Sequence, residues 1–277
     1  MINSEQKTCR IGPLTVGGGD LVVIAGPCLA ESLDMCLSIA ETMAGICRSL
    51  GVGYVFKTSF DKANRSSVSS FRGPGMQEGL NWLGAVREKI GCPVLTDIHE
   101  AAQAEPVGEV VDCIQIPAFL CRQTDLLVAA GRTNKTVNIK KGQFLAPWDM
   151  ANPVEKVLST GNDQILLSER GTMFGYNRLV TDFRAIAQMR SLAPVVFDAT
   201  HSTQEPGGLG SASGGQRQFA APLAAAAIAV GADALFFETH TDPDSALCDA
   251  ACQLPLTDMK QVITHCLALF KLCNQNQ

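Results

Sequence analysis

LVVIAGP, residues 21–27, is the first of eight apolar, β-branched runs that decide the fold of this chain. A nearly continuous apolar run is typical of a parallel strand that is buried on both faces, whereas a half-buried strand alternates apolar and polar residues. The other predicted strands are YVFKTS (54–59), PVLTDI (93–98), DCIQIP (112–117), TVNIKK (136–141), QILLSE (164–169), PVVFDA (194–199) and ALFFET (234–239).

Helical patterns separate these runs and follow the last one. They lie at residues 31–49, 76–90, 100–108, 122–131, 151–160, 178–191, 217–230 and 257–273. Eight evenly spaced β and α units predict an α/β fold, a (β/α)8 TIM barrel, and favour it over a doubly wound sheet. We expect residues 1–277 to form this single domain. Residues 9–20, CRIGPLTVGGGD, predict an N-terminal β-hairpin that covers one end of the barrel.

Composition and charge argue against several classes of protein. The 277 residues are 46% hydrophobic and carry a net charge of −5, which argues against a nucleic-acid-binding surface. The first residues, MINSEQKTCR, contain no long apolar run, so we expect neither secretion nor a membrane anchor. Eleven cysteines without a CxxC motif indicate packing thiols in a reducing, cytoplasmic environment.

Basic residues gather where the predicted strands end, which is where barrels of this type carry their active sites. Lys140 lies inside a strand, and a buried lysine needs a partner of opposite charge. We therefore expect an anionic ligand, and the number of cations predicts a phosphorylated small molecule with two or more anionic groups. The seven basic residues are Lys57, Lys62, Arg65, Arg122, Lys140, Lys141 and Arg170.

A second group predicts a divalent metal site. Cys28, His201 and Glu238 follow strands one, seven and eight, which are neighbours in a closed barrel. A thiolate, an imidazole and a carboxylate can hold a divalent ion with positions left open. Asp249 is the candidate fourth ligand, and Asp242 and Asp244 are alternatives.

Two features leave alternatives open. Cys28 is also compatible with buried packing or with a nucleophile that His201 deprotonates. The Gly-rich stretch at 202–216 predicts either a lid over the site or a plain mobile loop.

Nine segments together resemble the 3-deoxy-D-manno-octulosonate-8-phosphate synthases, also called 2-dehydro-3-deoxyphosphooctonate aldolases. They are GPCLAES (26–32), KTSFDKANRSS (57–67), FRGPG (71–75), DIHE (97–100), QIPAFLCRQTDLL (115–127), NIKKGQF (138–144), ERGTMFGYNRLVTD (169–182), FDATHS (197–202) and FFETHTDPD (236–244). The resemblance implies a homotetrameric barrel enzyme that condenses phosphoenolpyruvate with D-arabinose 5-phosphate and water in lipopolysaccharide synthesis.

A related family makes a seven-carbon product from erythrose 4-phosphate. It typically carries Lys-Pro-Arg-Thr where this chain has KANRSS at 62–67, and the latter version goes with the five-carbon sugar phosphate. The alternative from a non-enzyme class is a sensor barrel that binds a sugar phosphate without turning it over.

The resemblance also implies roles for individual residues. Lys57, Lys62, Asp97, Lys140 and His201 are the expected catalytic residues. Phosphoenolpyruvate is expected to contact Lys57, Ser59, Lys62, Gln115, Ala118, Lys140 and Arg170. The sugar phosphate is expected at Asn64, Arg65 and Ser66, and Phe119 and Arg122 are expected to reach a neighbouring subunit. Members with Asn at position 28 need no metal, whereas the set Cys28, His201, Glu238 and Asp249 implies a divalent ion (Zn, Mn or Fe).

Overall fold

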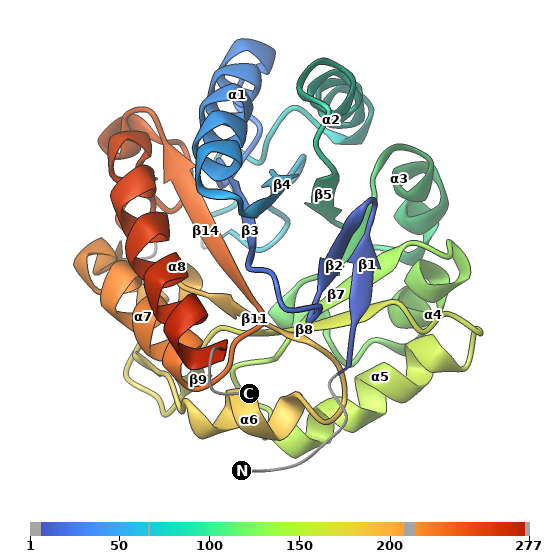
Figure 1. The fold of residues 1–277 in the computed structure, drawn as a ribbon. Helices are drawn as coiled ribbons and strands as arrows, with labels where there is room; N and C mark the ends of the chain where they lie inside the picture. Colours follow the sequence, from blue (N-terminus) through green and yellow to red (C-terminus); the bar gives the residue numbers. More distant parts are fainter. Residues whose placement is uncertain (1–6, 66, 208–213, 275–277) are drawn as a thin grey trace.

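Eight parallel strands close into a barrel in the computed structural model, which describes residues 7–65, 67–207 and 214–274 (Figure 1). Neighbouring strands pair in sequence order, and β11 closes the ring by pairing with β14, as Val196 opposite Ala234 shows. The predicted (β/α)8 barrel is thereby confirmed. The barrel strands are β3 (Val22–Gly26), β4 (Gly53–Lys57), β5 (Val94–Asp97), β6 (Cys113–Ile116), β7 (Thr136–Lys140), β8 (Ile165–Glu169), β11 (Val195–Asp198) and β14 (Ala234–His240).

A helix follows each barrel strand and packs on the outside of the ring (Figure 1). In α1, Ser32 caps the first turn by accepting a hydrogen bond from the Met35 amide, and Gly51 ends the helix with a φ of 68°. The helices are α1 (Leu33–Leu50), α2 (Met76–Ile90), α3 (Ala104–Val110), α4 (Thr124–Arg132), α5 (Ala151–Leu158), α6 (Arg184–Met189), α7 (Ala220–Ala229) and α8 (Met259–Asn274).

The prediction for residues 178–191 was wrong in its first part. Leu179–Val180 forms strand β10, which pairs with β9 (Thr172–Met173), and only Arg184–Met189 is helical. The apolar pair Leu179 and Val180 suits a short hairpin as well as a helix. Asp182 then separates hairpin from helix, because its side chain accepts a hydrogen bond from the Arg184 amide.

Other short elements lie at the two ends of the molecule. Gln204–Glu205 (β12) pairs with Gly214–Gly215 (β13) within the predicted loop at 202–216, and residues 208–213 of that loop lie outside the described residues. Leu254–Pro255 (β15) pairs in parallel with the end of β14. The predicted N-terminal hairpin is present as β1 (Cys9–Ile11) and β2 (Leu14–Val16).

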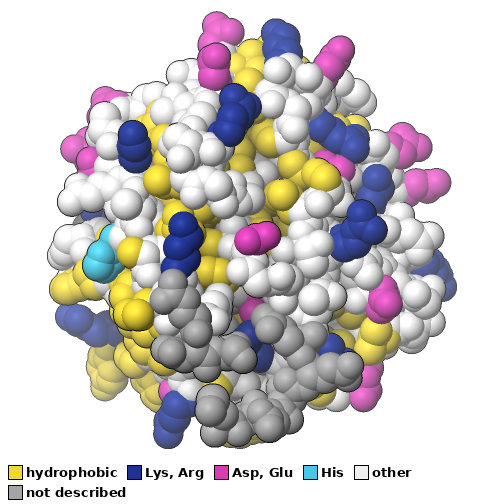
Figure 2. Space-filling view, in the orientation of Figure 1, with side chains coloured by type: hydrophobic (Ala, Val, Ile, Leu, Met, Phe, Trp, Pro, Cys, Tyr) yellow, Lys and Arg dark blue, Asp and Glu magenta, His cyan; other side chains and the backbone are white. Residues whose placement is uncertain are grey.

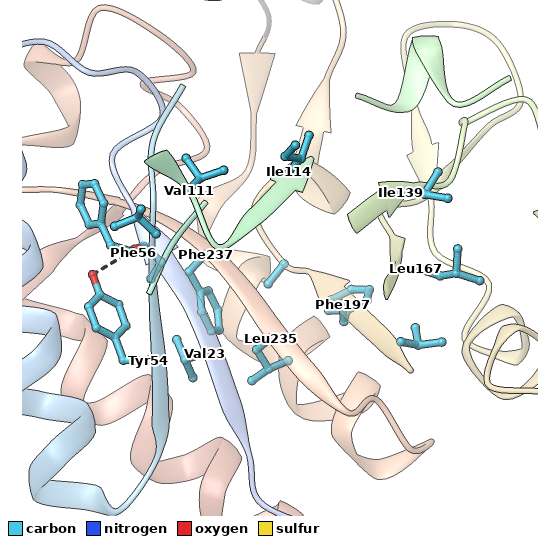
Figure 3. Close-up of a cluster of buried hydrophobic side chains, with 14 of the residues drawn as sticks. Val23, Tyr54, Phe56, Val111, Ile114, Ile139, Leu167, Phe197, Leu235 and Phe237 are labelled. Carbon is cyan, nitrogen blue, oxygen red and sulfur yellow. Dashed lines mark hydrogen bonds between the residues drawn. The ribbon is translucent and has the colours of Figure 1, made fainter. Parts of the chain in front are cut away.

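Period-two alternation divides each strand between the interior of the barrel and its outer face. Outward side chains pack beneath the helices, and Figure 3 shows this layer, where Tyr54 also donates a hydrogen bond to the Ala25 carbonyl at 3.1 Å. The inward residues form a separate apolar plug with the hairpin. This plug comprises Cys9, Ile11, Val16, Val22, Ile24, Val55, Leu95, Cys113, Leu166, Val196, Ala234 and Phe236. It closes the amino-terminal end of the barrel, so ligands must enter at the other end.

The cysteines are free and mostly buried, and the surface charges are dispersed rather than gathered in one patch. All eleven cysteines are free and ten of them are buried, as Cys36 and Cys47 are on the inner face of α1. Figure 2 shows Lys and Arg side chains as separate spots over the visible face, with acidic side chains between them. Within the described ranges, no helix is both long enough and apolar enough to cross a membrane.

Candidate active site at the carboxyl end of the barrel

The same alternation that builds the apolar plug carries polar side chains to the open end of the barrel. Lys57 comes two residues after the inward Val55, and Glu238 comes two residues after the inward Phe236. Asp97, Gln115 and Asp198 follow the same rule on their strands, and Lys140 comes two residues after the polar Asn138. A cavity of about 750 Å³ opens above this polar layer. The cationic side chains that line it are Lys57, Lys62, Arg65, Lys140 and Arg170.

Glu238 is fully buried next to the cavity, in contact with two lysines that line it. Its Oε1 is 3.0 Å from Lys57 Nζ and 3.6 Å from Lys62 Nζ. Burial would raise the pKa of Glu238, but the charges of Lys57, His201 and Lys62 hold it well below its usual range. The carboxylate is therefore ionised even though it is fully buried.

Lys140 lies across the barrel from Lys57 and has two partners. Its Nζ is 2.5 Å from Asp198 Oδ2 and 3.3 Å from His201 Nδ1. The ammonium also lies 4.2 Å from the centre of the Phe236 ring, within the range of a cation–π contact. Burial lowers the pKa of Lys140, and the Asp198 charge offsets this only in part. We expected the charge of Lys140 to be balanced by an anionic ligand. That expectation was incomplete, because Asp198 of the same chain already forms an ion pair with it.

Asp97, the last residue of β5, contacts Ser59, which follows β4, and His99, two residues further along its own segment. It accepts a hydrogen bond from Ser59 Oγ at 2.5 Å, and His99 Nε2 lies 3.2 Å from its Oδ2. Burial would raise the pKa of Asp97, but the hydrogen bond and charge of His99, with Lys57 and Lys62, lower it. Burial would likewise lower the pKa of His99, and Asp97 raises it instead. The two groups thus stabilise each other's charged forms.

Arg170 and Gln204 form the wall beside the metal candidates. Arg170 Nη2 donates to the His201 carbonyl at 3.1 Å and to Gln204 Oε1 at 3.0 Å. Gln204 Nε2 in turn donates to Asp249 Oδ1 at 2.9 Å. The Arg170 Nε group is buried and has no partner among the described residues, so it is free to donate to a ligand.

The residues expected to hold the sugar phosphate lie at the rim of the cavity. Asn64 and Arg65 both line it, and Ser66 lies outside the described residues. The guanidinium of Arg65 donates to Cys248 Sγ at 2.7 Å and to the Leu247 carbonyl at 3.0 Å. Arg65 therefore links the loop after β4 to the loop after β14.

Cys28, His201, Glu238 and Asp249 converge on one region. Asp249 Oδ2 lies 3.4 Å from Cys28 Sγ and 3.9 Å from His201 Nε2, and His201 Nε2 lies 3.6 Å from Glu238 Oε1. Glu238 Oε2 is buried and has no hydrogen-bond partner in the described part of the chain. A thiol, an imidazole and two carboxylates, one of which has an unpartnered oxygen, form a donor set that fits a divalent ion.

The alternatives for this region do not fit as well. Asp242 and Asp244 are exposed, and Asp244 pairs with Arg217 at 2.6 Å, so neither reaches the other ligands. Burial, followed by the neighbouring Cys248 and Glu238, raises the pKa of the Cys28 thiol well above its ordinary value. A nucleophilic cysteine needs a lowered pKa, whereas a metal ion can deprotonate a buried thiol directly.

Three expected residues lie away from the centre, and two help to build it. Phe119 lines the outer cavity and is 49% exposed, whereas Arg122 is exposed outside it. Lys141 is buried beside Glu169, with Nζ 3.6 Å from Oε2, and does not line the cavity. Ala118 and Gln115 both line the cavity, and Asn138 Nδ2 donates to Gln115 Oε1 at 3.2 Å.

The sequence-based site omitted four residues that hold the others in place: Asp198, Gln204, Cys248 and Gln253. The signal for Asp198 was its place two residues after the inward Val196. The other three lie in loops, where no periodicity tells which way a side chain points.

Comparison with known proteins agrees with this geometry. A family model described as the DAHP synthetase I family matches residues 2–272. A 2-dehydro-3-deoxyphosphooctonate aldolase from Syntrophotalea carbinolica is 58% identical over 271 residues, covering 97% of this chain and 98% of that protein. Proteins of the same name from Geobacter sulfurreducens and a Cyanothece species are 55% and 56% identical, over 95% and 92% of this chain and 97% and 94% of their own lengths. These matches confirm the resemblance seen in the sequence: the chain belongs to the DAHP synthetase I family and, within it, to the 2-dehydro-3-deoxyphosphooctonate aldolases.

Proposed function

We propose that this chain condenses phosphoenolpyruvate with D-arabinose 5-phosphate and water, giving 3-deoxy-D-manno-octulosonate 8-phosphate and inorganic phosphate. The observation that carries the proposal is the convergence of five cationic side chains on one cavity at the carboxyl end of the barrel. Two phosphates and one carboxylate must be held together there, and fixed cations offset their repulsion.

Phosphoenolpyruvate fits the inner part of the cavity. Lys57, Lys62, Lys140 and Arg170 surround the floor, and the unpartnered Arg170 Nε offers an additional donor. Ser59 lies behind this group and holds Asp97 in place, which assigns it a positioning role. A planar guanidinium suits a phosphate or carboxylate, and the lysines supply point charges.

The sugar phosphate fits the rim, with its terminal phosphate at Asn64 and Arg65. This places its aldehyde toward the floor, close to the phosphoenolpyruvate methylene carbon. Alignment is essential because an enol phosphate is a weak nucleophile, and well-held reactants can gain about 7–11 kcal/mol in this way.

The reaction then proceeds by attack of the methylene carbon on the aldehyde. A carbon–carbon bond forms, the aldehyde oxygen takes up a proton, and positive charge develops at the enol carbon. Water adds at that carbon, and phosphate leaves by cleavage of its carbon–oxygen bond. Asp97, His201 and the lysines lie around the reacting groups and are the residues available to hold and transfer these protons.

Cys28, His201, Glu238 and Asp249 would hold a divalent ion of the Zn, Mn or Fe type. Asp249 joins the two halves of this set, because its carboxylate lies close to Cys28 on one side and to His201 and Glu238 on the other. Bound there, such an ion polarises a carbonyl or lowers the pKa of a water molecule. We also propose that residues 1–277 act as one catalytic domain in a cytoplasmic homotetramer, in which Phe119 and Arg122 reach a neighbouring subunit. The exposure of both side chains is compatible with this role.

A parallel substrate assay tests the proposal. Phosphate release from phosphoenolpyruvate is measured with arabinose 5-phosphate and, separately, with erythrose 4-phosphate. We expect rapid release with the five-carbon sugar and little with the four-carbon sugar. The reverse preference would assign the seven-carbon reaction, and binding without release in both reactions would indicate a sugar-phosphate sensor.

A further inference from the structure

A second thiol, that of Cys248, lies next to the four residues proposed to hold the metal ion. Its Sγ is 3.6 Å from Asp249 Oδ2, and Cys28 Sγ is 3.4 Å from the same oxygen. The two sulfurs and a carboxylate oxygen of Asp249 all lie within 4.8 Å of one another. Zinc–sulfur bonds are about 2.3 Å long, so two thiolates on one ion stand at most about 4.6 Å apart. The two cysteines and Asp249 are therefore placed to share an ion, and Asp249 links them to the neighbouring group of His201 and Glu238.

The backbone at Asp249 explains how two consecutive residues reach the same point. Asp249 has a φ of +46°, in the left-handed region that residues other than glycine rarely occupy. Consecutive side chains in extended backbone point to opposite sides, whereas this turn directs Cys248 and Asp249 to one side. Unusual backbone of this kind is retained where the surrounding structure requires it, often at functional sites.

Gln253 holds the two cysteine segments together. Its Oε1 accepts a hydrogen bond from the Cys28 amide at 3.2 Å, and its Nε2 donates to the Cys248 carbonyl at 2.9 Å. Gln253 is fully buried, and Cys28, Leu29 and Cys248 pack as a small apolar cluster of their own. The sulfurs are thus held near each other by one rigid side chain rather than by chance contact.

Charge balance around the cluster also suits two thiolates. Two thiolates and two carboxylates on one divalent ion leave excess negative charge, which nearby cations must offset. Arg65 donates to Cys248 Sγ at 2.7 Å, and Lys62 lies 3.6 Å from Glu238 Oε1. The Cys248 sulfur already acts as an electron-pair donor to one cation, as a metal ligand must.

We propose that Cys248 is a fifth ligand of the metal centre, so that this chain binds its ion through two thiolates. This inference rests on the metal centre given under Proposed function and adds a ligand to it. Thiolates favour soft and borderline ions, so the centre takes Zn²⁺, Co²⁺ or Cd²⁺ in preference to Mn²⁺ or Mg²⁺.

Cobalt absorption tests the proposal without any activity measurement. The full chain is stripped of metal, kept reduced and titrated with Co²⁺, and the near-ultraviolet thiolate-to-cobalt charge-transfer band is measured. We expect Cys248→Ser to lose about half of this absorbance per bound cobalt. It should also weaken binding by at least roughly 10-fold, since even partners outside the ligand shell cost 10–100-fold. Cys273→Ser, a partly exposed thiol on α8, is the matched control and should change neither value.

The outcomes separate this proposal from the metal centre itself. If Cys248→Ser keeps the full band while Cys28→Ser loses all of it, the centre has one thiolate and the proposal is wrong. If Co²⁺ fails to bind the wild-type chain, both the centre and its fifth ligand are refuted. X-ray absorption of the Zn-loaded wild type gives the answer even if Cys248→Ser does not fold. Two sulfur neighbours at about 2.3 Å support the proposal, and one sulfur neighbour overturns it.

Discussion

Lys140 and Asp198 face each other across the open end of the barrel, with Nζ 2.5 Å from Oδ2 and both side chains almost fully buried. They come from β7 and β11, which are separated by β8, so the pair spans the interior rather than joining adjacent strands. His201 Nδ1 lies 2.8 Å from the same Asp198 oxygen. Asp198 thus holds both the Lys140 ammonium and the His201 imidazole at the cavity.

Replacing Lys140 by Met should abolish turnover and also destabilise the fold. Removing one partner of a buried ion pair leaves the other charge uncompensated, at a cost of about 3–5 kcal/mol. Urea unfolding measures the loss of stability, and phosphate release measures activity.

The double variant Lys140→Met/Asp198→Asn is the control for this prediction. It removes both charges, so it should recover much of the stability without recovering activity. Near-normal turnover in Lys140→Met would remove this lysine from the catalytic site.

Metal removal should inactivate the enzyme reversibly. A strong chelator withdraws the ion that Cys28, His201, Glu238 and Asp249 are proposed to hold, and Zn²⁺ or Mn²⁺ should restore phosphate release. Metal content is measured on the same samples by elemental analysis. Full activity in protein shown to be free of metal would return Cys28 to a packing role.

Replacing Arg65 by Ala should weaken binding of the sugar phosphate but not of phosphoenolpyruvate. A hydrogen bond to a charged group contributes about 1.5–3 kcal/mol, so KM for arabinose 5-phosphate should rise by about 10–100-fold. The matched control is Arg72→Ala, because Arg72 is exposed and pairs with Asp61 outside the cavity. An equal rise in KM for both substrates would place Arg65 at a different position from the one proposed.

The Asp97–His99 pair should make stability depend on pH. Asp97 raises the pKa of His99, so the pair stabilises the fold fully below pH about 6.5, the ordinary value, and this contribution is lost as pH rises through the raised value. His99→Gln should therefore be more destabilising at pH 6 than at pH 9, as urea unfolding can measure. His265→Gln, on the exposed side of α8, should show the same small effect at both values. If His99→Gln lowered the free energy of unfolding equally at pH 6 and pH 9, Asp97 would not act on His99 through charge.

The sequence by itself determined the barrel and most of the polar residues at its open end. Both follow from local periodicity: an apolar run reports a buried strand, and alternation then assigns Val55 and Lys57, or Val196 and Asp198, to the inward face. The short hairpin strand at Leu179–Val180 was not predicted, because two apolar residues are too few to show a periodicity of two or 3.6.

Only the tertiary structure decided which residues meet. Lys140 donates to Asp198, which is 58 residues away in the sequence, and Arg65 donates to Cys248, which is 183 residues away. Closure of the ring brings these distant strand ends to one rim. Closure of the ring also brings Asp249, rather than Asp242 or Asp244, close to Cys28 and His201, through a left-handed turn that no local pattern signals. Local preferences fix which way a strand residue faces, whereas partners separated by most of the chain are fixed only when the packed barrel makes their contact unavoidable.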